Sequence, residues 1–438
     1  MTAPTSRPRR PGLRTALAGR GGLARHHDFR QLWIGDTVSQ LGTQVSLLAL
    51  PVLAVRELGA TELQMGLLAA SETLAFLVIG LPAGAWVDRW RRKRVLVNAD
   101  LVRALALATL PAAWLFDLLT LAQLYLVALV VGASTVFFDV GYQSYLPSLV
   151  PPSRIAEGNA KLQASQSVAM VAGPAVAGTL IRLVGAPLAV LLDAASYLLS
   201  ALFVGRIRTV DAVPAATDRR PLRTEIAEGV RFVVHQPLLV RITSCTAISN
   251  LFSSMTGAML VLFALRDLGL TEATVGLAFS AGSVGGLLGA VSTTAVTRWV
   301  GEGRAIPLTA VGFAAAGFVL PLAGRPLPAP ATLVVSSFLL SYFVVVYNVT
   351  QVSFRQRLCP PALLGRMNAS IRFAVFGTMP LGALLGGVLA EGLGIRTMLW
   401  VAAVGGATAA LPVLFSPLLG MRTLPAELDV HAEAPPTP

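Results

Sequence analysis

Charged residues are scarce in this chain, and lysine is scarcer still. Only 13% of the 438 residues are charged, about half the share found in soluble domains. Two of the 34 basic residues, Lys93 and Lys161, are lysine. A Walker A loop ends in Gly-Lys-Ser or Gly-Lys-Thr, whereas Arg92 precedes Lys93 and Ala160 precedes Lys161. The sequence therefore has no such loop, which argues against ATP hydrolysis on this chain as an energy source.

Cysteine and histidine are almost as rare. Cys245 lies in an apolar segment and Cys359 in a basic loop, so a cysteine metal site is excluded and a structural disulfide is not expected. The four histidines all fall in predicted tails or loops: His26, His27, His235 and His431. We therefore expect no metal and no cofactor, and a proton carrier within an apolar segment has to be a carboxylate.

Apolar residues, in contrast, make up 55% of the chain, which is enough for roughly twelve membrane spans of ~20 residues each. This composition excludes a disordered chain, a disulfide scaffold and an ordinary soluble enzyme. The sequence predicts twelve spans: 30–55, 63–87, 95–116, 121–146, 161–184, 187–205, 240–265, 273–298, 304–323, 330–353, 370–390 and 396–418.

The basic residues predict how these spans are oriented, because cytoplasmic loops are enriched in Lys and Arg. With the N-terminus inside, 28 of the 34 basic residues fall in cytoplasmic segments, and Arg103 falls well within a span. The predicted external segments hold five: Arg56, Arg182, Arg266, Arg325 and Arg396. We expect a multi-pass protein of the cell (inner) membrane with both termini cytoplasmic. The net charge of +12 then reflects topology rather than nucleic-acid binding.

The longest polar stretch, 207–239, divides the spans into two sets of six. We expect a cytoplasmic tail (1–28), a six-helix bundle (29–206), a cytoplasmic linker (207–239), a second six-helix bundle (240–418) and a second cytoplasmic tail (419–438). The near-helical spacing of four apolar linker residues predicts an amphipathic helix on the inner membrane face, while 209–220 suits a flexible linker. These four residues are Leu222, Ile226, Val230 and Val233.

An internal repeat supports the division into halves. Six identities recur at an offset of 209 residues, with Asp139 aligned to Asn348 at the same offset. The identities pair Pro151-Pro152 with Pro360-Pro361, Asn159-Ala160 with Asn368-Ala369, Gly173 with Gly382, and Gly178 with Gly387. Since six spans separate the copies, both begin on the same side of the membrane, and the repeat is parallel.

The loop between the second and third spans carries a dense polar motif. It reads Gly84-Ala85-Trp86-Val87-Asp88-Arg89-Trp90-Arg91-Arg92-Lys93-Arg94. Gly84 allows another helix to approach closely, Asp88 can face the positive N-terminus of a neighbouring helix, and Arg92 lies one turn beyond Asp88 and can pair with it. A loop that merely obeys the positive-inside rule requires neither the Gly nor the Asp.

This motif resembles the cytoplasmic loop signature of the major facilitator superfamily, Gly-x-x-x-Asp-Arg-x-Gly-Arg-Arg/Lys, with Arg91 in place of the second Gly. The resemblance covers about 28–418 and implies an all-α membrane fold of twelve helices in two six-helix bundles related by a parallel repeat. It also implies that Asp88 contacts the eleventh helix and latches the outward-facing state. Further segments look like the drug:proton antiporter subgroup, which includes macrolide efflux proteins and enterobactin exporters: Phe29-Arg30, Pro147, Asn159 and 363–368.

Charges inside spans are candidates for function, since each costs ~2.5–3.5 kcal/mol at the bilayer centre. A carboxylate without a charged partner in a low-dielectric medium favours its protonated form. Asp36 in the first span and Glu72 near the middle of the second are therefore our proton-coupling candidates. Glu72 is preferred for its depth. The alternative is that both are neutral, hydrogen-bonded packing residues.

The other carboxylates have different expected roles. Asp100 and Arg103, three residues apart on one helix face, form either a mutually satisfied structural pair or part of the cavity. Asp139 lies near the depth of Arg92, and the family resemblance implies that it joins the loop charges in a cytoplasmic gate. Asp193 falls on a sixth helix, which in the superfamily is usually peripheral to the cavity.

The fifth predicted span contains Gly173-Pro174-Ala-Val-Ala-Gly178. Proline removes a backbone donor and glycine permits close helix packing. The segment resembles the antiporter signature of this helix, which implies a role in sealing the outer leak path of the cavity. Ordinary helix packing is the alternative.

These features favour a proton-coupled transporter, not an enzyme, that exports an amphipathic drug, antibiotic or secondary metabolite by alternating access. We expect a monomer whose partners are a small-molecule substrate, protons and the lipid bilayer. The C-terminal half has no deep basic residue, so a charged substrate is expected to be cationic. A siderophore exporter is the main alternative; an importer, a membrane-embedded enzyme and a non-transporting sensor are weaker ones.

Overall fold

A computed structural model describes residues 22–87, 90–151, 154–209, 228, 230–324, 327–359 and 363–422. Within these ranges the chain is nearly all helical, and twelve helical segments are long and apolar enough to cross a membrane. The number of spans predicted from the sequence is therefore confirmed. Large apolar side chains such as Leu105, Leu183 and Val291 are 67–75% exposed, as expected for helices that face lipid rather than water.

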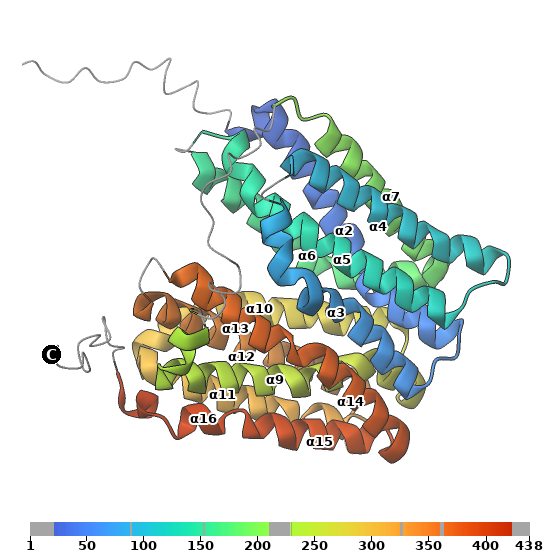
Figure 1. The fold of residues 1–438 in the computed structure, drawn as a ribbon. Coiled ribbons are helices and arrows are strands. Elements are labelled where there is room, and N and C mark those ends of the chain that lie inside the picture. Colours follow the sequence, from blue (N-terminus) through green and yellow to red (C-terminus); the bar gives the residue numbers. More distant parts are fainter. Residues whose placement is uncertain are drawn as a thin grey trace, which may run out of the picture.

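The first six spans form one bundle, which carries the blue-to-green part of the chain in Figure 1. They are α2 (His27–Arg56), α3 (Glu62–Val87), α4 (Arg92–Leu115), α5 (Leu121–Leu149), α6 (Ile155–Val184) and α7 (Ala186–Gly205). Helix α5 packs between α3 and α4, α7 packs between α4 and α2, and α2 packs against α6. This order leaves α3 and α6 next to the second bundle and places α4 and α7 on the far side.

The last six spans form the second bundle, in which several helices are interrupted. The seventh to tenth spans are α9 (Pro237–Leu262) with the π-helical turn η4 (Phe263–Asp267), α10 (Glu272–Val300), α11 (Glu302–Gly317) with the short 3-10 turn η5 (Leu320–Leu322), and α12 (Ala329–Leu358). The eleventh comprises α13 (Leu364–Phe376) and α14 (Thr378–Leu393), and the twelfth comprises α15 (Ile395–Thr408) and α16 (Leu411–Leu414).

Proline explains the two breaks, which were not predicted. A proline leaves the carbonyl four residues earlier without its helical donor and crowds that turn. Pro380 has this effect at Phe376, where α13 ends, and Pro412 has it at Thr408, where α15 ends. Pro51, Pro82 and Pro111 lie within α2, α3 and α4 without ending them.

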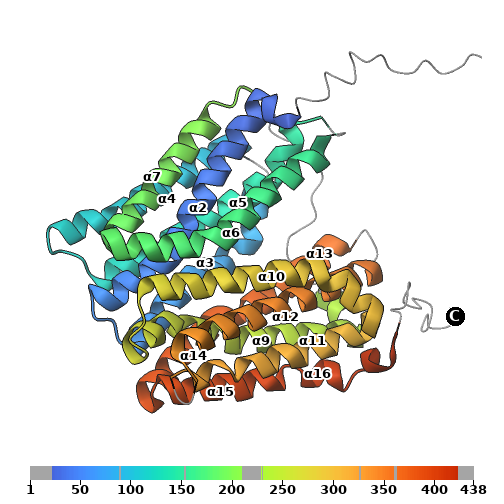
Figure 2. The same ribbon diagram turned by 180° about the vertical axis from the view of Figure 1, so that it is seen from behind.

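The two bundles lie close together at one end and diverge toward the other (Figures 1 and 2). The close end contains the loops 57–61 and 268–271, and the open end contains both described ends of the chain. Contacts between the bundles are made mainly by α3 with α14 and by α6 with α10. The fold thus encloses space between two halves that are joined at one end.

Only part of the linker lies within the described residues. Of the four residues predicted to form its amphipathic helix, Leu222 and Ile226 lie outside them. Val233 is buried in the apolar cluster that includes Leu239 and Ile242, whereas Val230 is 45% exposed. One buried and one exposed side chain are consistent with an amphipathic segment, but the helix as a whole stays a prediction.

Candidate transport cavity and gates

A cavity of about 450 Å³ lies between the bundles. Its walls come from α2, α3 and α6 on one side and from α9, α10 and α14 on the other. The apolar lining includes Met65, Leu68, Phe279 and Met379. Polar groups are contributed by both halves: Gln44, Glu72, Thr73, Asn250, Ser253, Ser254 and Ser283. An apolar wall with a few polar groups suits an amphipathic small molecule.

Glu72 is the one charged side chain among the described residues that line this cavity. It is half-buried on α3, and it has no hydrogen-bond or ion-pair partner among the described residues. The neighbouring helix comes close at this point, since a side chain on Gly132 would meet the Glu72 carbonyl oxygen at 2.8 Å. The backbone of α3 is therefore held against α5 at Glu72, while the Glu72 side chain lines the cavity.

Asp36, the other predicted proton-coupling residue, lies elsewhere. Its side chain is 3% exposed inside the first bundle, where the Gln40 amide donates a hydrogen bond to Oδ1 at 3.5 Å. It is not among the residues lining the cavity between the bundles. Sequence position within a span predicted depth for Asp36 and Glu72, but it could not predict which way each side chain points.

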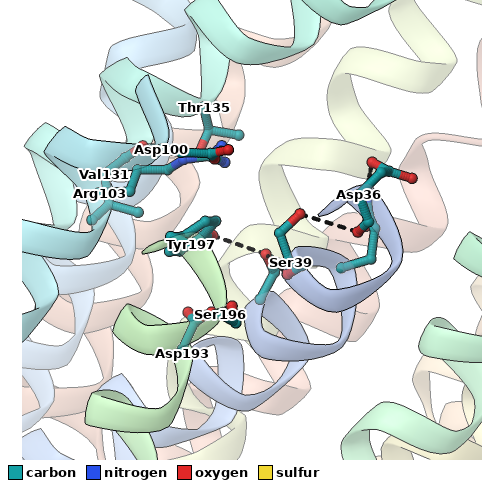
Figure 3. A network of polar contacts seen from close by, with 11 residues as sticks. Asp36, Ser39, Asp100, Arg103, Val131, Thr135, Asp193, Ser196 and Tyr197 are labelled. Atoms are coloured by element: carbon teal, nitrogen blue, oxygen red, sulfur yellow. Dashed lines mark hydrogen bonds and ion pairs between the residues drawn. The ribbon is translucent and has the colours of Figure 1, made fainter. Parts of the chain in front are cut away.

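Asp100 and Arg103 form the predicted ion pair, and both are almost completely buried. The guanidinium carbon of Arg103 also lies 4.4 Å from the ring centre of Phe138 and 4.2 Å from that of Tyr197. Two aromatic faces and one carboxylate thus compensate for burial of the cation. Figure 3 shows the pair beside Tyr197, and neither residue is among those lining the cavity between the bundles.

Asp193 belongs to the same buried polar network, which links α2 to α7 (Figure 3). It accepts hydrogen bonds from Ser46 and from Ser196, the latter at 2.9 Å. Tyr197 adds a hydrogen bond of 2.8 Å to Thr43. Gly42 makes this approach possible, because a side chain there would lie 2.3 Å from Asp193 Oδ1.

Asp139 lines a smaller cavity of about 220 Å³ toward the open end of the bundles. The facing wall is formed by α13 and includes Arg372, so residues of opposite charge from the two halves share one cavity. Phe76 and Phe376 bring the halves together beside them, with ring centres 6.4 Å apart. This placement is compatible with a gate at the open end.

Only part of the predicted gate motif is described. Gly84 lies in the last turn of α3 and Arg92 begins α4, whereas Asp88 and Arg89 lie outside the described residues. The predicted contact of Asp88 with the eleventh helix is therefore untested. Lys93 donates a hydrogen bond of 2.6 Å to the carbonyl of Ile207, just beyond α7, where a cation complements the negative end of a helix.

The predicted motif in the fifth span packs α6 against two helices. A side chain on Gly173 would meet Gln44 of α2 at 2.6 Å, and one on Gly178 would meet the Glu272 carbonyl oxygen of α10 at 2.4 Å. Pro174 lines the cavity, and the next amide, on Ala175, donates to Ser280 of α10 at 2.9 Å. The motif therefore joins the halves at the closed side of the cavity.

Ion pairs also join the halves at this end. Arg56 Nε lies 2.9 Å from Glu272 Oε1, and Arg266 Nη1 lies 3.7 Å from Glu62 Oε1. Arg266 also donates to the carbonyl of Ala60 at 2.8 Å. From the sequence, Arg56 and Arg266 were predicted to lie in external segments, and no pairing was predicted for them. Acidic residues at the starts of the second and eighth spans were the signal that could have suggested pairing.

The cysteines play no part in these sites. Both are buried, and desolvation raises the pKa of the Cys359 thiol above its usual value. Among the described residues, no group of three His, Cys, Asp or Glu side chains is placed to hold a metal ion.

The Major Facilitator Superfamily model matches the chain at residues 32–376 and 242–436. The chain belongs to this superfamily. It is 28% identical to the multidrug efflux pump Tap of Mycolicibacterium fortuitum over 370 residues, which cover 81% of this chain and 87% of Tap. It is 21% identical to macrolide efflux protein A of Streptococcus pyogenes over 374 residues, which cover 84% and 90% of the two chains.

A solved structure of similar fold is that of the nucleoside transporter NupG. Its TM-score is 0.73 at 14% identity, and the match covers 88% of this chain and 98% of NupG. The protein is thus a multi-pass membrane transporter with the major facilitator fold, as the loop motif and the repeat predicted. Its relatives include named drug efflux pumps.

Proposed function

We propose that this chain is a proton-coupled exporter of amphipathic, cationic or neutral small molecules and that Glu72 is its coupling carboxylate. The observation that carries the proposal is the position of Glu72 as the one charged group among the described residues lining the cavity between the bundles. The named functions of two relatives, multidrug and macrolide efflux, support drug export.

The lining of the cavity favours this substrate class. Its described residues include several apolar side chains, one carboxylate and no basic group. A multiply anionic siderophore requires cationic partners, so siderophore export gains no support from this cavity. A single chain supplies both bundles and every described wall of the cavity, so a monomer suffices, and no enzymatic activity is proposed.

The proposed cycle depends on which side of the membrane the closed end of the bundles faces. We infer from the charge distribution that both termini are cytoplasmic. The loops 57–61 and 268–271 then face outward, and the described conformation is closed on that side. When the outer side opens, Glu72 takes a proton and substrate leaves. When the inner side opens, the proton is released and the carboxylate can bind a new substrate, because proton and substrate compete for one group.

The testing experiment measures drug efflux in a host without its own pumps, with and without a protonophore. We expect Glu72→Gln to abolish protonophore-sensitive efflux while the protein remains in the membrane. Asp117→Asn is the matched control, since Asp117 lies in an external loop with a positive φ of 56°, which Asn adopts readily. Full efflux by Glu72→Gln would remove Glu72 from the mechanism.

Asp36→Asn tests the second carboxylate. We expect a smaller effect than for Glu72→Gln, because Asp36 is enclosed within one bundle and already accepts a hydrogen bond from Gln40. If Asp36→Asn abolished coupling while Glu72→Gln retained it, coupling would be assigned to the interior of the first bundle instead.

A further inference from the structure

A groove of about 600 Å³ follows the surface of the first bundle beside α4. Trp90, Arg91 and Arg94 form its end near the start of α4, and Asn98, Val102 and Phe137 continue it along α4 and α5. The main neighbours of α4 are α5 and α7, and α4 lies on the side of the bundle away from the second bundle (Figures 1 and 2). This α4–α5 groove is therefore separate from the transport cavity.

The groove has a basic end and an apolar body. Arg91 and Arg94 are exposed, and their side chains have no hydrogen-bond or ion-pair partner among the described residues. A second pocket of about 400 Å³ shares both arginines and adds Lys93 and Arg208. None of the described residues lining either pocket is acidic. This end is therefore suited to an anionic group rather than to a cation.

The apolar body runs into the membrane span. From Arg94 to Val102 the helix rises roughly 12 Å at ~1.5 Å per residue. Val102 is 44% exposed. The centre of the Phe137 ring lies 6.0 Å from that of Trp86 and 5.9 Å from that of Trp90. Trp90 itself is 50% exposed, and tryptophan is typical of the headgroup level of a bilayer.

We propose that the α4–α5 groove is a binding site for an anionic phospholipid. The headgroup phosphate binds Arg91 and Arg94 with Asn98 beside it, and an acyl chain lies along Val102 and Phe137. Charge complementarity selects an anionic over a zwitterionic lipid, as in other basic pockets between membrane helices. The same two arginines flank Arg92 and Lys93, so the bound lipid holds the start of α4 next to the predicted gate motif.

The test uses quenching of tryptophan fluorescence in vesicles that contain brominated lipid. We expect brominated phosphatidylglycerol to quench the full-length protein at lower mole fraction than brominated phosphatidylcholine. The preference should be about ten-fold or more, because each basic residue near an anionic surface contributes roughly a five-fold factor. Trp90→Phe should remove the part of the quenching that shows this preference.

Three variants separate the groove from general charge. Arg91→Gln/Arg94→Gln should abolish the lipid preference, and Arg91→Lys/Arg94→Lys should retain it. The matched control is Arg231→Gln/Arg298→Gln, which removes two exposed charges that do not line the groove and should retain the preference. If the two Gln double variants lost the lipid preference equally, the preference would arise from overall charge, and the proposal would be overturned.

Two further measurements test the lipid assignment itself. Val102→Phe fills the apolar body while leaving both arginines, and it should weaken quenching by brominated phosphatidylglycerol. Soluble glycerol phosphate should not displace the lipid. Displacement by glycerol phosphate, or full lipid preference in Val102→Phe, would indicate a simple anion site and would contradict binding of an acyl chain in the groove.

Discussion

Arg56 and Glu272 form an ion pair between the two bundles, joining the last residue of α2 to the first residue of α10. Arg266 and Glu62 form a second pair between the end of η4 and the start of α3. Each residue of the second pair lies 210 positions from its counterpart in the first. The two pairs are thus related by the internal repeat, and together they connect the halves on the closed side of the cavity.

Glycine contacts follow the same relation. Gly276 of α10 faces Gly178 of α6, and a Cβ atom added at Gly276 would lie 3.1 Å from the Gly178 Cα. Gly66 of α3 faces Gly387 of α14 in the equivalent contact, in which a Cβ atom added at Gly66 would lie 3.0 Å from the Gly387 Cα. Helix backbones approach this closely only where side chains are absent. The two halves therefore pack closely on the closed side, where the ion pairs also lie.

We predict that Glu272→Gln shifts the population toward the state open at this end by about two- to five-fold. The effect is modest because Arg56 is 49% exposed and exposed pairs contribute ~0.2–1 kcal/mol. Electron–electron resonance distances between spin labels at Phe116 and Leu393, two exposed residues at this end, measure the shift. Combining Arg56→Gln with Glu272→Gln should add little to either change. Arg182→Gln, which removes an exposed charge in the last turn of α6, is the control and should change nothing.

We predict a larger effect for Gly276→Val. Its added side-chain carbon would lie 2.2 Å from the carbonyl oxygen of Pro174, and a backbone atom of a helix cannot rotate away. The halves should therefore stay apart at this end, the distance between spin labels at Phe116 and Leu393 should lengthen, and efflux should fall at least ten-fold. Gly205→Val is the control, because nothing lies within 4 Å of a side chain at Gly205. An unchanged distance in a folded Gly276→Val protein would show that this contact does not limit closure.

The sequence predicted the twelve spans because lipid-facing helices are apolar over their whole length, and this pattern is independent of their neighbours. It did not predict the closed side. A repeat compared at one offset, 209, aligns Gly178 with Gly387 but not Arg56 with Arg266, which are 210 residues apart. Because of this one-residue difference, the comparison at 209 does not reveal that the ion-pair residues of the two copies are equivalent. The ion pairs also join unlike positions of the two copies, which only the arrangement of the bundles brings together.

The buried carboxylates show a similar limit. Asp100 and Arg103 were predictable as a pair because the helix itself brings residues three apart together. The contacts of Arg103 with Phe138 and Tyr197 come from α5 and α7 and depend on tertiary packing. For the same reason the sequence could not separate Asp36, which faces the interior of one bundle, from Glu72, which faces the cavity.

We predict that the Asp100–Arg103 pair stabilises the fold rather than binding substrate. Arg103→Met leaves Asp100 buried without its partner and should lower the free energy of unfolding by about 3–5 kcal/mol. Replacing both with apolar residues, as Asp100→Leu/Arg103→Met, should recover most of this loss. Thermal unfolding in detergent measures both variants. Efflux by the double variant should stay near the wild-type level; loss of efflux in a stable double variant would place the pair in the transport mechanism.

We predict that Glu72 also selects substrates by charge. Glu72→Gln removes the negative charge from an otherwise neutral cavity lining. Equilibrium binding of a lipophilic cation, measured without a proton gradient, should weaken roughly ten- to hundred-fold, because an interaction with a charged group contributes ~1.5–3 kcal/mol. A neutral compound of similar size should bind almost unchanged, since it depends on Met65, Phe279 and the other apolar walls. Glu72→Asp keeps the charge and should preserve most of the preference for the cation. Equal weakening of both ligands in Glu72→Gln would mean that this residue shapes the cavity without selecting charge, because a shape change affects both compounds alike.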